Sequence, residues 1–271
     1  MKKMLMLLML VAGLAGDDAV MTRYNVMLSL FGKVGEATII VARRGDEYRM
    51  IVEDYATGLA ARVSGNERDR FVSSGHIRDG FYISDRFELY QTNDKTVESN
   101  IYVFDHEAKT VTRYQDKNET VTERSFNAMN MRFEEYTRQK IGKKTEVLDF
   151  YSSYDALSVV LNFTKLLADG GRIEIKPVGL AKKERKMYIS RPTAEALPEL
   201  LEEFDYPGIA RVVQLDSVEL ESDDEYGVLI GYDVRGSIDE VVTKETYFLI
   251  GYGRIEKMDQ MQISPDVVFD E

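Results

Sequence analysis

The sequence predicts a mainly β protein built on one curved antiparallel sheet, a half-barrel or barrel, with one central helix and a second, short helix. Three observations predict this fold. Short segments that suit strands recur about every ten residues. Tight polar turns join them, without the strand–helix–strand alternation that indicates a parallel sheet. One long helical pattern interrupts the run of strands.

The first half of the chain is typical of sequentially paired antiparallel strands. Tyr24, Val26 and Leu28 alternate with other residues at the period of a strand that has one face in a core. Glycine-containing turns are expected at 32–35 and 45–46, and the pattern breaks at 58–65. The predicted strands are 24–30, 37–43, 47–55, 71–77, 81–83, 87–92, 100–105, 110–114, 121–126 and 129–136. So long a sheet must curl to bury one face.

The segment from Tyr154 to Leu167 is the one strong helical signal, and we expect the sheet to be arranged around it. Ser152 or Ser153 can cap its first turn, and Asp155 lies where the positive end of the helix dipole favours an acid. Apolar residues occupy almost the whole circumference of this helix. We therefore expect it to lie against or inside the curved sheet.

The rest of the chain returns to strands. Segments 172–177 and 186–190 read as a strand pair, and 193–204 reads as the second helix, with Pro198 near its first turn. Long strands are expected at 210–220, 227–235 and 241–252. A sub-boundary could fall near Glu146, but strands lie on both sides of it, so we expect residues 16–271 to form a single exported β-rich domain.

Residues 1–15 have the features of a secretory signal peptide. Lys2 and Lys3 precede an apolar run from Met4 to Leu14, and Gly13-Leu14-Ala15 fits a cleavage site. The apolar run is shorter than the roughly 20 residues that span a bilayer, so cleavage is favoured over a retained anchor. We expect a periplasmic protein with no integral membrane span after cleavage.

Composition argues against several functions. The chain has no cysteine, so disulfides, thiol catalysis and cysteine metal sites are excluded. The formal charge is −12, from 35 basic and 47 acidic residues. Nucleic acid is therefore not an expected partner, because phosphates need a basic footprint.

The residues that carry common chemistries are scarce. His76 and His106 are the two histidines, and nothing in the sequence brings them together. No nucleophile elbow or pair of histidines at zinc-ligand spacing is present, so we expect no enzyme, no catalytic residues, no metal site and no cofactor. A Ser/His site could be drawn from Ser73, Ser74 and His76, but a histidine at the end of a strand is the commoner arrangement. The acids between Glu219 and Glu225 are typical of a solvated hairpin tip, and no calcium loop is present.

Aromatic residues are the more useful clue to function. Many fall in the predicted strands, where they would line the inner face of the sheet. Such residues are mainly core, but a sheet curved around a helix can also hold an apolar ligand. For Asp155 we favour helix capping over ligand binding. The candidate ligand-binding residues are Tyr24, Tyr48, Phe87, Tyr102, Phe104, Asp155 and Ser158.

A set of short motifs carries a resemblance to a known family. The motifs are Tyr24-x-Val26, Gly32-x-x-Gly35-x-Ala37, Ser74-Gly75-x-Ile77, Phe104-Asp105 and Asp155-Ala156-Leu157-Ser158. Their order and spacing, over roughly 24–191, resemble the exported bacterial proteins grouped as domain of unknown function 3108. The resemblance implies a periplasmic, mostly antiparallel β fold without an assigned activity or catalytic residues. In that family an arginine often follows in the helix, where this chain has Leu161-Asn162-Phe163-Thr164.

Three functions are compatible with these observations. The first is non-enzymatic periplasmic binding of a lipid or other apolar ligand in the curved sheet, for which the fold also looks like that of periplasmic lipoprotein carriers. The second is an envelope structural or assembly factor that binds a partner protein through an exposed strand edge. The third and least favoured is a carboxylate-dependent cell-wall hydrolase, whose paired acids would meet only in the folded protein.

Overall fold

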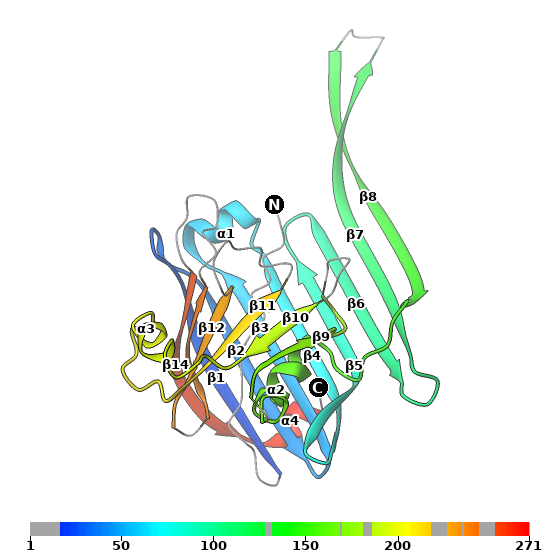
Figure 1. Cartoon of the computed structure of the whole chain (residues 1–271). Coiled ribbons are helices and arrows are strands. Elements are labelled where there is room, and N and C mark those ends of the chain that lie inside the picture. Colours follow the sequence, from blue (N-terminus) through cyan, green and yellow to red (C-terminus); the bar gives the residue numbers. More distant parts are fainter. Residues whose placement is uncertain are drawn as a thin grey trace.

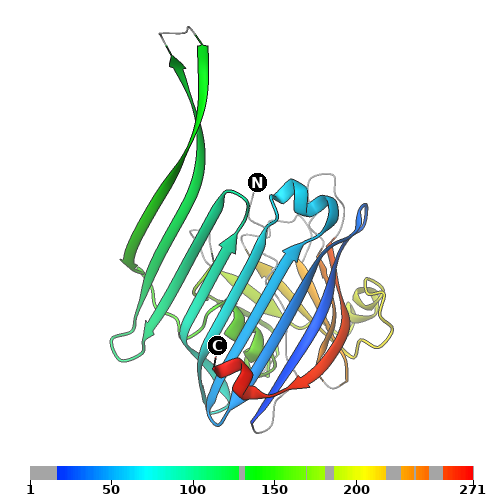
Figure 2. The ribbon, with the colours of Figure 1, turned by 180° about the vertical axis from the view of Figure 1, so that it is seen from behind.

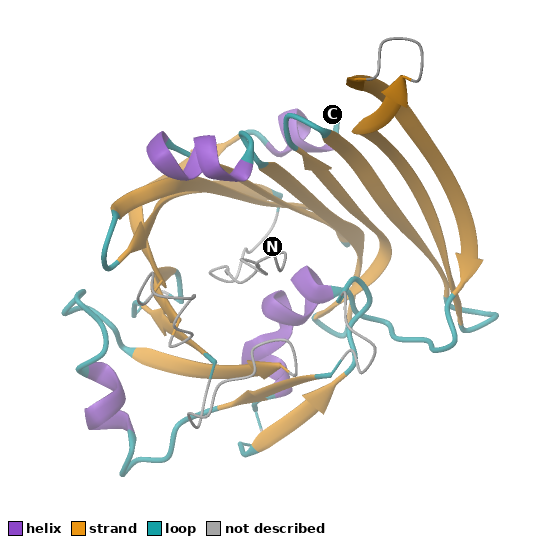
Figure 3. Ribbon diagram, turned by 90° about the horizontal axis from the view of Figure 1, so that it is seen from above, coloured by secondary structure: helices purple, strands orange, loops and turns teal. Residues whose placement is uncertain are grey.

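One antiparallel sheet forms almost the whole molecule (Figure 1). The computed structural model describes residues 17–127, 132–168, 170–180, 186–217, 227–234, 236–243 and 253–270. Within them the sheet has 14 strands in the order β8-β7-β6-β5-β4-β3-β2-β1-β14-β13-β12-β11-β10-β9. Seen from above it curls around the central helix without closing (Figure 3). The predicted mainly β fold is confirmed, as a half-barrel with open edges β8 and β9 rather than a closed barrel.

The first eight strands pair in chain order, as the pattern of turns predicts. They are β1 (Asp18–Leu28), β2 (Gly32–Arg44), β3 (Glu47–Ala56), β4 (Arg68–Arg78), β5 (Phe81–Thr92), β6 (Thr96–Asp105), β7 (Thr110–Asn127) and β8 (Arg132–Val147). The remaining strands are β9 (Arg172–Ile175), β10 (Met187–Ser190), β11 (Arg211–Ser217), β12 (Val228–Tyr232), β13 (Ile238–Thr243) and β14 (Gly253–Ile263). Because β14 pairs with β1, strands on both sides of Glu146 belong to the same sheet (Figure 2).

Two pairs of predicted strands are each one longer strand. Segments 81–83 and 87–92 are joined in β5, which carries a bulge at Asp85: Ser74 pairs with Arg86, and Gly75 pairs with Ser84. Segments 110–114 and 121–126 are joined in β7, so the turn expected between them is wrong. The residues between them, up to Glu119, pair with both β6 and β8, so the strand continues through the polar Asp116-Lys117-Asn118.

The central helix is confirmed as α2 (Ala156–Leu166), and it packs on β4 and β5. Its N-cap is Asp155, not Ser152 or Ser153. Its buried side chains lie on almost every side, as the sequence predicts: Ala156, Leu157, Ser158, Val159, Val160, Asn162 and Phe163. They join the aromatic and β-branched residues of the inner face of the sheet in one core.

The other helices depart from expectation. The break at 58–65 contains a short helix, α1 (Gly58–Ser64), and α4 (Pro265–Phe269) was not predicted. The second predicted helix is only α3 (Leu197–Leu201), because Pro198 lies in its first turn and helical pairing begins there. Within the described part of the chain, no helix combines the length and apolarity that crossing a membrane requires.

Some predicted elements have different boundaries in the structure, and others lie outside the described residues. The turn expected at 32–35 lies at 29–31, and Gly32 begins β2. The strand expected at 241–252 overlaps the end of β13, which starts at Ile238, and residues 244–252 lie outside the described residues. The following β14 was not predicted. The signal peptide and the acids between Glu219 and Glu225 lie outside the described residues.

Candidate functional site

The seven predicted ligand-binding residues are all buried, with exposed fractions of 0 to 8%. Tyr48, Asp155 and Ser158 meet in one polar network under α2. Phe87 and Tyr102 stack with ring centroids 6.0 Å apart. Tyr24 lies elsewhere, on β1, where its hydroxyl donates to the carbonyl oxygen of Ile238 at 3.2 Å. The structure thus places them in the core, and a role in ligand binding stays a prediction.

The polar network fixes the start of α2. Asp155 Oδ1 accepts hydrogen bonds from the backbone N–H groups of Leu157 at 2.7 Å and Ser158 at 2.9 Å. The Ser158 hydroxyl in turn lies 3.0 Å from the Asp155 N–H, which completes a capping box. Ser84 on β5 joins the network, since its hydroxyl lies 2.8 Å from that of Ser158. Burial raises the pKa of Asp155 to about 6, although the hydrogen bonds favour its charged form.

The Ser/His arrangement considered from the sequence is not formed by Ser73. Its hydroxyl donates to Asp155 Oδ2 at 2.6 Å and lies 2.9 Å from the Tyr48 hydroxyl. His76 instead faces the bulged Asp85. Ser73 is therefore part of the cap of α2.

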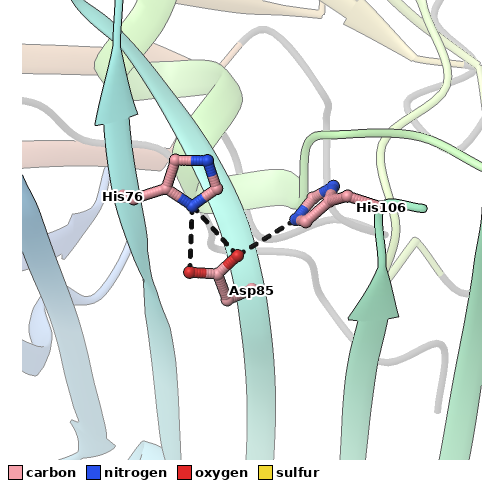
Figure 4. Close-up of side chains that lie close together, drawn as sticks. All are labelled: His76, Asp85 and His106. Carbon is pink, nitrogen blue, oxygen red and sulfur yellow. Dashed lines mark hydrogen bonds and ion pairs between the residues drawn. The ribbon is translucent and has the colours of Figure 1, made fainter.

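The two histidines, which nothing in the sequence brings together, meet at one end of the neighbouring strands β4, β5 and β6 (Figure 4). His76 Nδ1 lies 3.1 Å from both carboxylate oxygens of Asp85, and His106 Nε2 lies 3.0 Å from Asp85 Oδ1. The imidazole rings are 5.6 Å apart and nearly perpendicular. The His106 side chain is 29% exposed and packs against Phe104 and Tyr151. Sequence reasoning missed this cluster because its members come from three strands or strand ends.

Polar residues occupy the concave face of the sheet farther from α2. Asp54 and Asp69 are direct cross-strand partners on β3 and β4, and Gln91 on β5 donates to Asp69 at 3.0 Å. Burial and then the charge of Asp69 raise the pKa of Asp54 to about 8. The structure thus places Asp54 and Asp69 together on adjacent strands, and the hydrolase hypothesis stays a prediction.

A small hollow lies beside the C-terminal half of α2. Its empty space, part of which is open to solvent, amounts to about 180 Å³, and it is lined by Phe163, Thr164, Leu167, Arg191, Arg211, Val213 and Tyr232. The guanidinium of Arg211 lies 4.6 Å from the centre of the Tyr232 ring, and its buried Nε has no hydrogen-bond partner. The hollow combines apolar walls with two cationic side chains, which is the chemistry that an anionic amphiphile needs.

The hairpin of β7 and β8 forms the other candidate surface, and its outer part extends beyond the sheet (Figures 1 and 2). The strand β6 pairs with β7 only as far as Glu119. From Thr120 to Asn127, β7 pairs with β8 alone. In β8, every described side chain from Arg132 to Thr145 is exposed. The hairpin therefore ends in a two-stranded ribbon with solvent on both faces.

The convex side of β6, β7 and β8 carries an apolar patch, here called the outer patch. It consists of Val97, Val103, Tyr114, Ile141 and Val147, which are 37 to 70% exposed. Cross-strand pairing places them on one face: Asn118 pairs with both Val97 and Ile141, and Thr112 pairs with both Val103 and Val147. The opposite face of the same strands carries the buried Tyr102 and Phe104.

The fold and these surfaces define a mainly β protein with one open antiparallel sheet and a helix packed on its concave face. No protein-family model and no curated protein matches the chain. The resemblance to domain of unknown function 3108 therefore stays a prediction.

Proposed function

We propose that this protein is a non-enzymatic protein of the periplasm that binds an extended segment of another envelope protein along the β7–β8 hairpin. The single observation that carries the proposal is the exposed two-stranded ribbon, which continues the sheet without a third strand or a core. An isolated two-stranded ribbon is marginally stable in water. Pairing with a strand of a partner protein would therefore stabilise this ribbon.

The open edge of β8 supports strand addition. It is 16 residues long, whereas exposed edges are usually short, bulged or covered. An extended peptide can pair with such an edge through main-chain hydrogen bonds, with side-chain contacts adding specificity. The outer patch lies beside this edge and offers apolar contacts to the same partner.

Charge indicates the kind of segment that would fit. Between Arg138 and Lys144, β8 carries four cationic residues and no acid, in a chain with a net charge of −12. On its paired side, Lys143 contacts Asp116 at 3.2 Å and Arg138 contacts Glu123. A strand added on the open side would meet the same cations, so an acidic extended segment is favoured. A second copy of β8 would instead set like charges against one another.

Photo-crosslinking in intact cells tests this function. A photoreactive phenylalanine analogue at Ile141, on the β8 edge, should give one defined adduct with an envelope protein. The same analogue at Leu59, which is 63% exposed on α1, is the matched control. Replacing both Lys140 and Lys143 by Glu should reduce the Ile141 adduct at least tenfold. Equal adducts at both positions, an adduct with a second copy only, or a protein found in the cytoplasm would each contradict the proposal.

The hollow beside α2 supports a second candidate, which is binding of an anionic apolar ligand. The supporting observation is the buried, unpartnered Nε of Arg211 above Tyr232. The hollow has almost no room for even a water-sized sphere, so one end of a lipid would enter only if α2 or the side chains around the hollow move. Native mass spectrometry after incubation with envelope lipids should show a retained lipid that Arg211→Gln loses. A single unshifted mass for the wild-type protein would contradict it.

A further inference from the structure

Two imidazoles and one carboxylate converge on a common point in the cluster of His76, Asp85 and His106 (Figure 4). One ligand atom from each residue lies within 4.8 Å of the other two. The His–Asp separations are 3.0 and 3.1 Å. Around a tetrahedral Zn²⁺ with bonds of 2.0–2.1 Å, neighbouring ligand atoms lie about 3.3 Å apart. Both His–Asp separations are therefore already close to metal-ligand spacing, and the two imidazole nitrogens lie within 4.8 Å of each other.

The backbone builds this convergence. Asp85 is the extra residue of the bulge in β5, and bulges commonly re-aim a side chain out of the regular alternation. The bulge lies opposite Gly75, where a side chain would collide with the backbone of β5. His76 follows Gly75 on β4, and His106 follows the last residue of β6. The strands β4 and β5 and the turn after β6 thus each contribute one donor.

Contacts behind the cluster hold the His106 ring with Nε2 toward Asp85. Its Nδ1 lies 2.7 Å from the hydroxyl of Tyr151, which lies 3.2 Å from the Ser153 hydroxyl. The ring also stacks on Phe104, with centroids 6.2 Å apart. Histidines that bind metal through one nitrogen usually donate the other N–H to such an acceptor, which fixes the tautomer and orientation of the ring.

We propose that His76 Nδ1, His106 Nε2 and the Asp85 carboxylate bind a divalent transition-metal ion of the Zn²⁺ class. Two imidazole donors favour Zn²⁺ over Mg²⁺ or Ca²⁺, which prefer oxygen ligands. Three protein ligands leave one tetrahedral position for water or for a group from a partner. This metal site revises the expectation of no metal site, which was based on sequence spacing alone.

The bound ion would connect parts of the chain that are distant in sequence. It would join β4, β5 and the end of β6, and through Tyr151 it would reach the segment that leads from β8 into α2. The cluster also lies near the root of the β7–β8 hairpin, since β7 begins four residues after His106. Bound metal should therefore stiffen the start of α2 and the base of the hairpin together.

The composition of the chain makes the test specific. The two histidines of the cluster are the only ones in the sequence, and there is no cysteine. Imidazole-dependent metal binding can thus arise only here. The chain without residues 1–15 would be treated with a chelator, dialysed and titrated with Zn²⁺ by calorimetry. Imidazole ¹⁵N resonances would be recorded before and after the titration.

We expect one Zn²⁺ per chain, with the ¹⁵N signals of His76 Nδ1 and His106 Nε2 shifted. His76→Gln, His106→Gln and Asp85→Asn should each weaken binding at least about 100-fold, and Tyr151→Phe about tenfold. Glu107→Gln is the matched control, because it removes an exposed acid one residue from His106 and should leave affinity unchanged. The competing outcome is that hydrogen bonds alone hold the three side chains together. Imidazole signals of the wild-type protein that do not respond to Zn²⁺ would then overturn the proposal, even if a variant fails to fold.

Discussion

The hydroxyl of Ser73 on β4 donates a 2.6 Å hydrogen bond to Oδ2 of Asp155, which lies 82 residues later and caps α2. The cap of the helix is therefore also its attachment to the sheet. Asp155 is fully buried, so its carboxylate depends on this bond and on two backbone N–H donors for the interactions that water would otherwise supply. The position of α2 in the half-barrel is set by polar contacts as well as by apolar packing.

Replacing Asp155 by Ala should lower the free energy of unfolding by about 3 kcal/mol. Loss of an N-cap costs about 1 kcal/mol, and the buried donors of Ser73, Leu157 and Ser158 would lose their acceptor as well. Urea unfolding monitored by circular dichroism measures the change. Asp155→Asn keeps one acceptor oxygen and should cost less, while Glu107→Ala on the surface should cost less than about 0.5 kcal/mol. A loss for Asp155→Ala no larger than that of the surface variant would show that the network adds nothing to stability.

The Asp54 carboxyl should make the protein less stable in alkaline solution. Its pKa is raised in the folded state, to about 8, by burial and by Asp69, from 3.8 in the unfolded chain. The folded state therefore binds the proton more tightly, and this contribution to stability is present below about pH 4 and is lost as the pH rises through about 8. Asp155, whose pKa is about 6, acts in the same direction at lower pH.

The change Asp54→Asn isolates this effect. At pH 9 the variant should be more stable than the wild-type protein by about 2 kcal/mol, a value that allows for partial solvent screening of the half-buried carboxyl. At pH 4, where both side chains are neutral, the two proteins should be nearly equal. Thermal unfolding across this range measures the difference. A difference that does not vary with pH would assign the effect to packing instead of ionisation.

The parts of the fold that could be predicted are those where one face of a strand or helix is buried. The alternation around Tyr24 and Val26 and the apolar circumference of α2 both follow from burial, and both predictions are confirmed. The outer part of β7 was predicted as a separate strand at 121–126, because the polar Asp116-Lys117-Asn118 resembles a turn and hides the continuity of β7. The bulge at Asp85 interrupted the pattern of β5 and concealed its continuity. The meeting of His76 with His106 depends on this bulge and on the register of three strands, which no local pattern contains.

Gly75 should be indispensable to the bulge. A Cβ at this position would collide with the Ile83 carbonyl oxygen and lie 2.8 Å from the Asp85 nitrogen. Gly75→Ala should therefore lower the free energy of unfolding by about 1–3 kcal/mol, as overpacking commonly does. Gly142→Ala on β8 is the matched control, because a Cβ there meets no atom within 4 Å. Urea unfolding of both variants checks the prediction, which would be wrong if the two changes had equal effects.

The outer ribbon of the β7–β8 hairpin should be dispensable for folding. Replacing residues 120–139 by Asn-Gly would join Glu119 to Lys140, which are paired residues, through a tight turn. Because the ribbon adds no buried core, the free energy of unfolding should change by less than about 1 kcal/mol. In the intact protein, amide hydrogens of 120–127 and 132–139 should exchange faster than those of β1 to β3, since hydrogen bonds exposed on both faces open readily. The shortened protein should also lose the crosslinked adduct at Ile141. Slow exchange in the ribbon of the isolated protein, or a large loss of stability on shortening, would show that the ribbon is held by its own fold and does not need a partner.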